Sequence, residues 1–347
     1  MVTTPGKWGT SPALWGICLG FLLVGLALAL AADRGADPPL GPSEYEGQLL
    51  LGARAMVPGE DIPASDWEPQ LLSPLQVRLD AWIFRVFGVS IENARALSAL
   101  MALGVVALFY FLLLRPMGPP TAFLAALILT VNPIFFGVAR TAQPSVMSLL
   151  LMLLTMALWT AGARRGPAAF ASGVFLVLAG LVENGPASVF FLFAGVLVAA
   201  LLRMHAWKMA WLPETRRRLR FFWAGVFLAV CAYFLFILAN WHGFGTMWSH
   251  LTRLSPRILA GNVLRSPLYA ASMIRYMPIT AVIALGYFLF FAKGAVRPLA
   301  RHRRLDEIRL WLLGWLLMGI PFFVLRGDPN LYGLILLVPP LSALAAE

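Results

Sequence analysis

Charged residues are scarce in this chain of 347 residues. Only 12% of the residues are charged, against about 25% in a typical soluble domain, and 60% are hydrophobic. A chain this apolar cannot hide its apolar surface in one core, so the composition predicts a protein whose solvent is the lipid bilayer.

Cysteine and histidine are equally sparse, which excludes several kinds of site. The two cysteines, Cys18 and Cys231, both lie inside apolar runs and form neither a disulfide framework nor a metal-ligand pattern. The four histidines are scattered and match no metal spacing. We therefore expect no cofactor and assign no metal ligands, although use of a metal ion is left open.

Ten apolar runs along the chain predict about ten transmembrane helices in a single domain, residues 1–347. Asn132-Pro133 falls late in the third run and predicts a kink or an end of that helix. The fifth and sixth runs are short enough to form a re-entrant hairpin instead. The runs are Ala13–Ala32, Ala96–Leu114, Thr121–Val138, Pro144–Ala161, Ala168–Val182, Ala187–Leu202, Phe221–Ala239, Met277–Phe291, Leu310–Leu325 and Leu331–Ala346.

The net charge of +11 has a topological explanation. With the N-terminus in the cytoplasm, the inside segments hold 16 basic and four acidic residues, and the outside segments hold 11 basic and 12 acidic residues. This bias predicts a multi-pass protein of the bacterial inner membrane with its N-terminus in the cytoplasm. The run Arg216-Arg217-Arg218 is then an anchor for membrane lipids, and we assign no nucleic-acid role to the charge.

Two long polar segments face the outside in this topology. The first, residues 33–95, holds ten of the sixteen acids, and within it residues 44–56 and 73–87 have the spacing of amphipathic helices that lie in the membrane interface. The second, residues 240–276, carries four arginines and no acid. We expect no sheet, so the predicted fold class is an all-α polytopic membrane protein.

Several short stretches follow one another along the chain. They are Glu46-Gly47 with Gly52-Ala53-Arg54, Pro74-Leu75, residues 84–90, Ala94-Arg95, Ala139-Arg140 with Pro144, Gly185-Pro186, and Tyr332 with Pro339. In this order they resemble the membrane glycosyltransferases that use polyprenyl-phosphate sugars, the GT-C class that includes protein O-mannosyltransferases and the lipid A aminoarabinose transferase. The resemblance covers nearly the whole chain and implies a GT-C-like fold.

Three positions depart from the family pattern. The family's outer loop has Asp-Glu, with the aspartate as catalytic base, whereas this chain has Tyr45 before Glu46. Ser145 stands where the family usually has an aspartate, and Asn184 stands where it commonly has a lysine. These departures also fit a protein of this fold that does not catalyse a transfer.

The implied transfer needs a carboxylate to take the acceptor's proton and cations to meet the phosphate. Glu46 is the predicted base, with Glu44 as its substitute, although an acid at a helix start is also favoured by the helix dipole alone. Asp66 is predicted to bind a sugar hydroxyl, or else is a solvated loop acid. The predicted phosphate ligands are Arg253, Arg257, Arg265 and Arg326; their alternatives are lipid anchoring for the first three and pairing with Asp328 for Arg326.

The favoured function is an enzyme, an inverting transferase that moves a sugar from a polyprenyl-phosphate carrier to an extracytoplasmic lipid, glycan or protein. The alternative is a catalytically degenerate GT-C-like scaffold or subunit with a membrane-protein partner. A transporter is disfavoured because the chain shows no internal repeat with paired broken helices.

Overall fold

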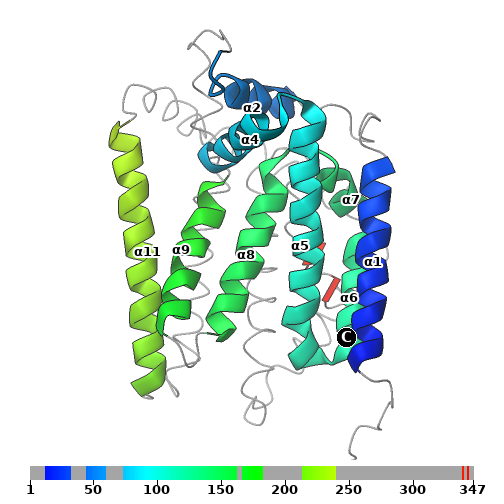
Figure 1. Cartoon of the computed structure of the whole chain (residues 1–347). Helices are drawn as coiled ribbons and strands as arrows, with labels where there is room; N and C mark the ends of the chain where they lie inside the picture. The colour runs from blue at the N-terminus through cyan, green and yellow to red at the C-terminus, as the bar shows by residue number, and fades with distance from the viewer. Residues whose placement is uncertain are drawn as a thin grey trace, which may run out of the picture.

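The computed structural model describes residues 12–32, 44–59, 73–161, 166–182, 213–239, 338–339 and 342–343. All secondary structure within these ranges is helical, as the sequence predicts (Figure 1). The helices are α1 (Pro12–Ala32), α2 (Glu44–Arg54), α4 (Pro74–Phe87), α5 (Ile91–Met117), α6 (Pro119–Val131), α7 (Pro133–Ala139), α8 (Pro144–Ala161), α9 (Gly166–Leu181) and α11 (Pro213–Ala239). Long helices form a bundle, and the short helices α2 and α4 lie across one end of it.

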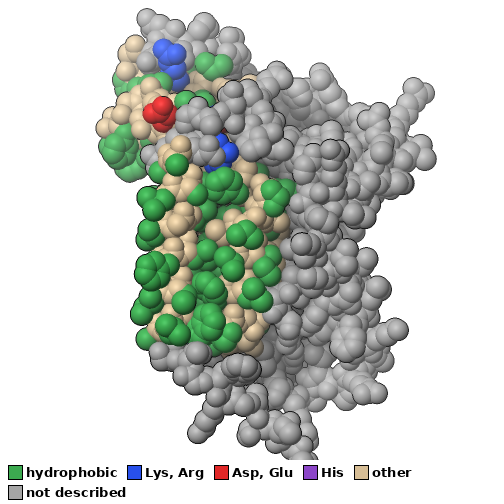
Figure 2. Space-filling view, turned by 90° about the vertical axis from the view of Figure 1, so that its right-hand side faces the viewer, with side chains coloured by type: hydrophobic (Ala, Val, Ile, Leu, Met, Phe, Trp, Pro, Cys, Tyr) green, Lys and Arg blue, Asp and Glu red, His purple; other side chains and the backbone are tan. Residues whose placement is uncertain are grey.

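Four helices in the described ranges are long and apolar enough to cross a membrane, namely α1, α5, α8 and most of α11, and the pair α6–α7 adds a bent fifth. Helix α9 is apolar but has only 16 residues, as expected of the short fifth run. On the side of the molecule that carries α1, Figure 2 shows hydrophobic side chains below the charged side chains of the α2–α4 end. The remaining predicted spans, and the single-domain organisation, depend on residues outside the described ranges.

The third predicted span is broken at Asn132-Pro133. Helices α6 and α7 meet there at an angle of 65°. The Asn132 side-chain oxygen accepts hydrogen bonds from the backbone N–H groups of Ile134 and Phe135, at 3.0 and 3.2 Å. Proline at the first position of α7 lacks the N–H that would continue α6, so the cap and the proline together start a new helix.

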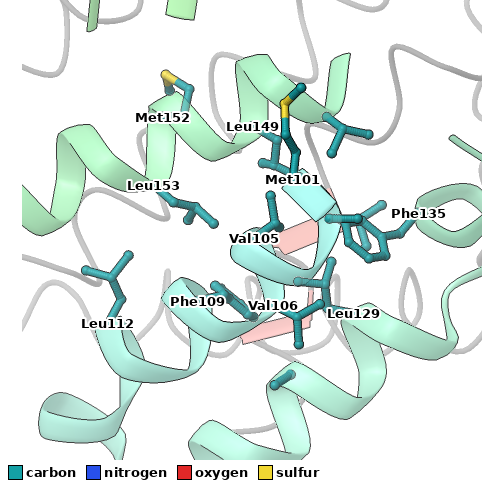
Figure 3. Close-up of a cluster of buried hydrophobic side chains, with 14 of the residues drawn as sticks. Met101, Val105, Val106, Phe109, Leu112, Leu129, Phe135, Leu149, Met152 and Leu153 are labelled. Atoms are coloured by element: carbon teal, nitrogen blue, oxygen red, sulfur yellow. The ribbon is translucent and has the colours of Figure 1, made fainter. Parts of the chain in front are cut away.

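Helix α5 is central to the bundle and contacts α1, α4, α6, α7 and α8. Its Val105, Val106 and Phe109 are buried against Leu129 of α6 and Leu149 of α8 (Figure 3). The helix begins at a serine cap, where the Ser90 hydroxyl accepts from the backbone N–H of Glu92 at 3.1 Å. This start places the first turn of α5 directly beside the short helices.

Two of the predicted inside segments meet at one end of the bundle. Arg115 ends α5 and the arginine run 216–218 begins α11, so both lie at the end opposite α2 and α4 (Figure 1). Helices α2 and α4, which belong to the predicted outer segment, lie at the other end. That the end with Arg115 faces the cytoplasm stays a prediction.

Small residues bring α8, α9 and α11 together. Two hydroxyls of the α8–α9 pair donate to backbone carbonyls across the interface, Ser148 to Ala179 and Ser172 to Thr155, each at 2.9 Å. At Gly173 of α9 and Gly225 of α11, the backbones of these two helices are in direct contact. Close approach at small residues is a common way for helices to associate in lipid, where no hydrophobic effect drives them together.

We expect Gly173→Ala to lower the free energy of unfolding by about 1–3 kcal/mol. A Cβ at this position would overlap the Phe222 carbonyl oxygen and approach the Val226 nitrogen to 2.9 Å, so α9 and α11 must move apart. Unfolding by sodium dodecyl sulfate in mixed micelles measures the loss. Gly25→Ala in α1 is the control, because no heavy atom lies within 4 Å of its added Cβ. Equal stability of the two variants would contradict the backbone contact.

Candidate functional site

The short helices α2 and α4 form the candidate site with the first turns of α5. Both were predicted as amphipathic helices of the outer segment, and both are present close to the predicted bounds. Helix α2 packs on α4, and α4 packs on α5. Apolar residues of α4 and its end, such as Trp82 and Phe87, are exposed, as expected for a helix at the membrane interface.

Glu46 on α2 accepts hydrogen bonds from two segments that are distant from it in sequence. Its carboxylate accepts from Arg95 of α5 through both oxygens, Nε to Oε1 at 3.0 Å and Nη2 to Oε2 at 3.3 Å. The backbone N–H of Ala142, in the loop between α7 and α8, donates to the same Oε1 at 2.7 Å. With only 2% of Glu46 exposed, this is a buried ion pair that ties α2 to the bundle.

Asp80 on α4 is a second buried carboxylate near Glu46. The side-chain amide of Gln76, one turn earlier, donates to both of its oxygens, at 3.0 and 2.9 Å. Asp80 and Gln76 are both fully buried. Burial raises the pKa of the Asp80 carboxyl from 3.8 to about 7; the Gln76 hydrogen bonds oppose this rise and the Glu46 charge adds to it. The Asp80 carboxyl therefore titrates near neutral pH.

We expect the free energy of unfolding to fall as pH rises from about 4 to about 7. Asp80→Asn should remove this fall. The folded pKa of Asp80 is raised, so its contribution is fully present below 3.8 and is lost as pH rises through about 7. Thermal unfolding midpoints at pH 5 and pH 8 measure this, with the exposed Glu92→Gln as control. Identical pH profiles for the wild type and Asp80→Asn would refute the assignment.

The loop after α7 adds a third element to the site. Arg140, only 8% exposed, lies with its guanidinium carbon 5.8 Å from the centre of the Phe136 ring. Ser145, at the position where the family usually has an aspartate, is buried in the first turn of α8. This loop therefore brings one buried arginine and a backbone donor to the end of the bundle that holds Glu46.

Most of the predicted site residues lie outside the described part of the structure. Glu44 begins α2, but its side chain is outside the described part. The same is true of every atom of Asp66, Arg253, Arg257, Arg265 and Arg326. Of the predicted site residues, Glu46 alone has a described side chain.

Sequence reasoning missed the roles of Arg95, Asp80 and Gln76. Arg95 had a signal, since Ala94-Arg95 is one of the family-like stretches, but nothing in the sequence pairs it with Glu46. Gln76 and Asp80 belong to the polar face of an amphipathic helix, which suggests exposure to water. The structure buries these two side chains instead. Within the described ranges, no group of three metal-binding side chains comes together.

Comparison with known proteins rests on structure, because no protein-family model and no curated protein matches the sequence. The chain is similar to the crystal structure of ArnT from Cupriavidus metallidurans bound to undecaprenyl phosphate, with a TM-score of 0.66 at 16% sequence identity. The likeness covers 96% of this chain and 59% of that chain. This chain therefore has the GT-C-like membrane fold that its sequence predicts, and it spans about three fifths of the length of that protein.

Proposed function

We propose that this chain of GT-C-like fold is a membrane glycosyltransferase that moves a sugar from a polyprenyl-phosphate carrier to an extracytoplasmic acceptor. One observation carries the proposal: two buried carboxylates, Glu46 and Asp80, lie with Arg95 at the α2–α4 end of the bundle. Buried ionisable groups with a perturbed pKa are typical of functional sites. The similarity to a protein solved with undecaprenyl phosphate supports the carrier class.

The reaction requires one proton acceptor and one site for the leaving phosphate. The acceptor hydroxyl oxygen forms a bond to the anomeric carbon of the sugar while the bond from that carbon to the phosphate oxygen breaks. The hydroxyl proton passes to a carboxylate, and the electron pair of the broken bond leaves on the polyprenyl phosphate. The attack from the opposite face inverts the anomeric centre.

Asp80 is the better proton acceptor of the two described carboxylates. A base with a pKa near the working pH combines ionisation with the ability to take a proton, and the pKa of Asp80 is raised to about 7. Glu46, which the sequence predicts as the base, has three hydrogen bonds to its oxygens and is better suited to positioning α2. The predicted arginines 253, 257, 265 and 326 remain the proposed phosphate ligands, and Glu44 and Asp66 remain proposed contacts of the acceptor or sugar.

A non-catalytic GT-C-like subunit is the second candidate. The ion pair of Glu46 with Arg95 and its hydrogen bond to Ala142 favour this candidate, because a carboxylate with these contacts stabilises the fold. Tyr45 at the family's aspartate position points the same way. Such a subunit would still bind lipid but would need a catalytic partner in the membrane.

An assay of the purified protein separates the two candidates. Radiolabelled polyprenyl-phosphate sugars, offered as a panel with a membrane extract as acceptor source, should give label in an acceptor and free polyprenyl phosphate in equal amounts. Carrier binding without release of polyprenyl phosphate from any donor, together with a co-purifying membrane protein, would favour the subunit. Failure to bind any polyprenyl phosphate would reject both candidates.

A further inference from the structure

A groove lies under α4 on the surface formed by α9 and α11. Its volume is about 320 Å³, at the lower end of the roughly 300–1,000 Å³ typical of small-molecule sites. Its lining includes Leu75 and Arg78 of α4, Leu178 of α9, and Leu228, Ala232 and Tyr233 of α11. Leu228 is 57% exposed, so the groove opens on the outer surface of the bundle, where lipid chains would lie.

The packing of α9 on α11 explains why the groove lies at this end. The two backbones are in contact at Gly173 and Gly225, which leaves no space between them there. Figure 1 shows the helices separating toward the end that carries α4. Beyond the contact, the walls of the groove are aliphatic and aromatic side chains. An occupant must therefore be a slender apolar chain.

Arg78 supplies a charge at the α4 end of this groove. Its guanidinium carbon lies 4.9 Å from the centre of the Phe236 ring, and its side chain is exposed. In the part of the chain that the structure describes, no carboxylate pairs with Arg78. A guanidinium over a ring can still donate its N–H groups to phosphate oxygens.

The groove is separate from the carboxylate site. Arg78 is two residues from both Gln76 and Asp80, which places it about 200° around the helix from each of them. Those two side chains are buried, whereas Arg78 is exposed over the groove. A phosphate bound at Arg78 is therefore on the other side of α4 from Asp80. A sugar donor that reacts beside Asp80 does not have its phosphate there.

We propose that this groove binds an anionic glycerophospholipid, with one acyl chain between α9 and α11 and its phosphate on Arg78. The charge of Arg78 and the apolar walls match an anionic headgroup above a hydrocarbon chain. Basic residues beside spanning helices are a recurrent means of binding such lipids. The bound lipid connects α4 to α9 and α11, and it is a structural lipid that is not consumed. This assignment is independent of the transferase activity.

Titration of the full-length protein in detergent tests the proposal. Dioleoylphosphatidylglycerol and dioleoylphosphatidylcholine are added to delipidated protein, and native mass spectrometry measures the bound lipid. We expect phosphatidylglycerol to bind more tightly, and Arg78→Gln to weaken its binding roughly ten- to 150-fold, the range for a lost charge-assisted contact. Arg220→Gln, an exposed arginine at the opposite end of α11, should leave the affinity unchanged.

A variant that fills the groove tests separately whether the groove binds the acyl chain of the lipid. Ala232 is exposed on α11, so Ala232→Trp fills the groove without disturbing buried packing and should abolish tight binding. A phosphatidylglycerol with a diazirine in its acyl chain should label α9 and α11 in the wild type and lose that labelling in Ala232→Trp. Equal affinity for the two lipids, or unchanged binding in either Arg78→Gln or Ala232→Trp, would overturn the proposal. So would displacement of phosphatidylglycerol by a lower concentration of undecaprenyl phosphate, which would make the groove a carrier site.

Discussion

Asp80→Asn is expected to lower the turnover of the proposed transfer by about 10²- to 10⁴-fold, the usual loss when a general base is removed. Asparagine has nearly the same shape and can still bond Gln76, but it cannot accept the hydroxyl proton. The affinity for the polyprenyl-phosphate carrier should be unchanged, since the proposed phosphate ligands are other residues. Wild-type turnover should rise as pH increases through about 7, where Asp80 loses its proton.

The same assay ranks the other carboxylates. Glu46→Gln should reduce turnover less than Asp80→Asn once activity is corrected for the folded fraction, and Glu44→Gln should be milder still. Glu92→Gln, at an exposed position in the first turn of α5, is the matched control and should be fully active. A larger loss in Glu46→Gln would return the base role to Glu46. Retained transfer in the double variant Glu46→Gln, Asp80→Asn would refute base catalysis by this pair.

Arg95→Leu is expected to lower the free energy of unfolding by about 3–5 kcal/mol, because it leaves the buried Glu46 carboxylate without its counter-charge. Glu46 is 2% exposed and cannot recover the lost energy by contact with water. The Ala142 N–H would still donate to it. Since the Arg95 pair joins α2 to α5, α2 should also become more accessible to protease.

The double variant Glu46→Leu, Arg95→Leu is the informative control. Replacing both partners of a buried pair by apolar residues of similar volume is often neutral or stabilising. We therefore expect the double variant to recover much of the stability lost by Arg95→Leu, as measured by unfolding in sodium dodecyl sulfate at fixed lipid content. If the double variant is no more stable than Arg95→Leu, the loss comes from packing of the arginine stem and the charge argument is wrong.

Much of the fold is predictable from local properties of the sequence. Each predicted span that falls in the described ranges is an apolar helix, and the break at Asn132-Pro133 follows from one asparagine cap and one proline ring. The helices at residues 44–56 and 73–87 follow from the period of their side chains. Such features are predictable because hydropathy, periodicity and capping depend on residues only a few positions apart.

The candidate site depends on contacts that no local pattern contains. Glu46 meets Arg95 across 49 positions and Ala142 across 96. Asp80 and Gln76 carry the pattern of a water-facing helix side, yet α2 packs on α4 and they are buried. The sequence by itself determined a helical membrane protein, and it predicts that the acidic segment faces outward. Only the tertiary structure decided which carboxylate is paired and which is left with a raised pKa, because both burial and charge pairing depend on segments that meet only after folding.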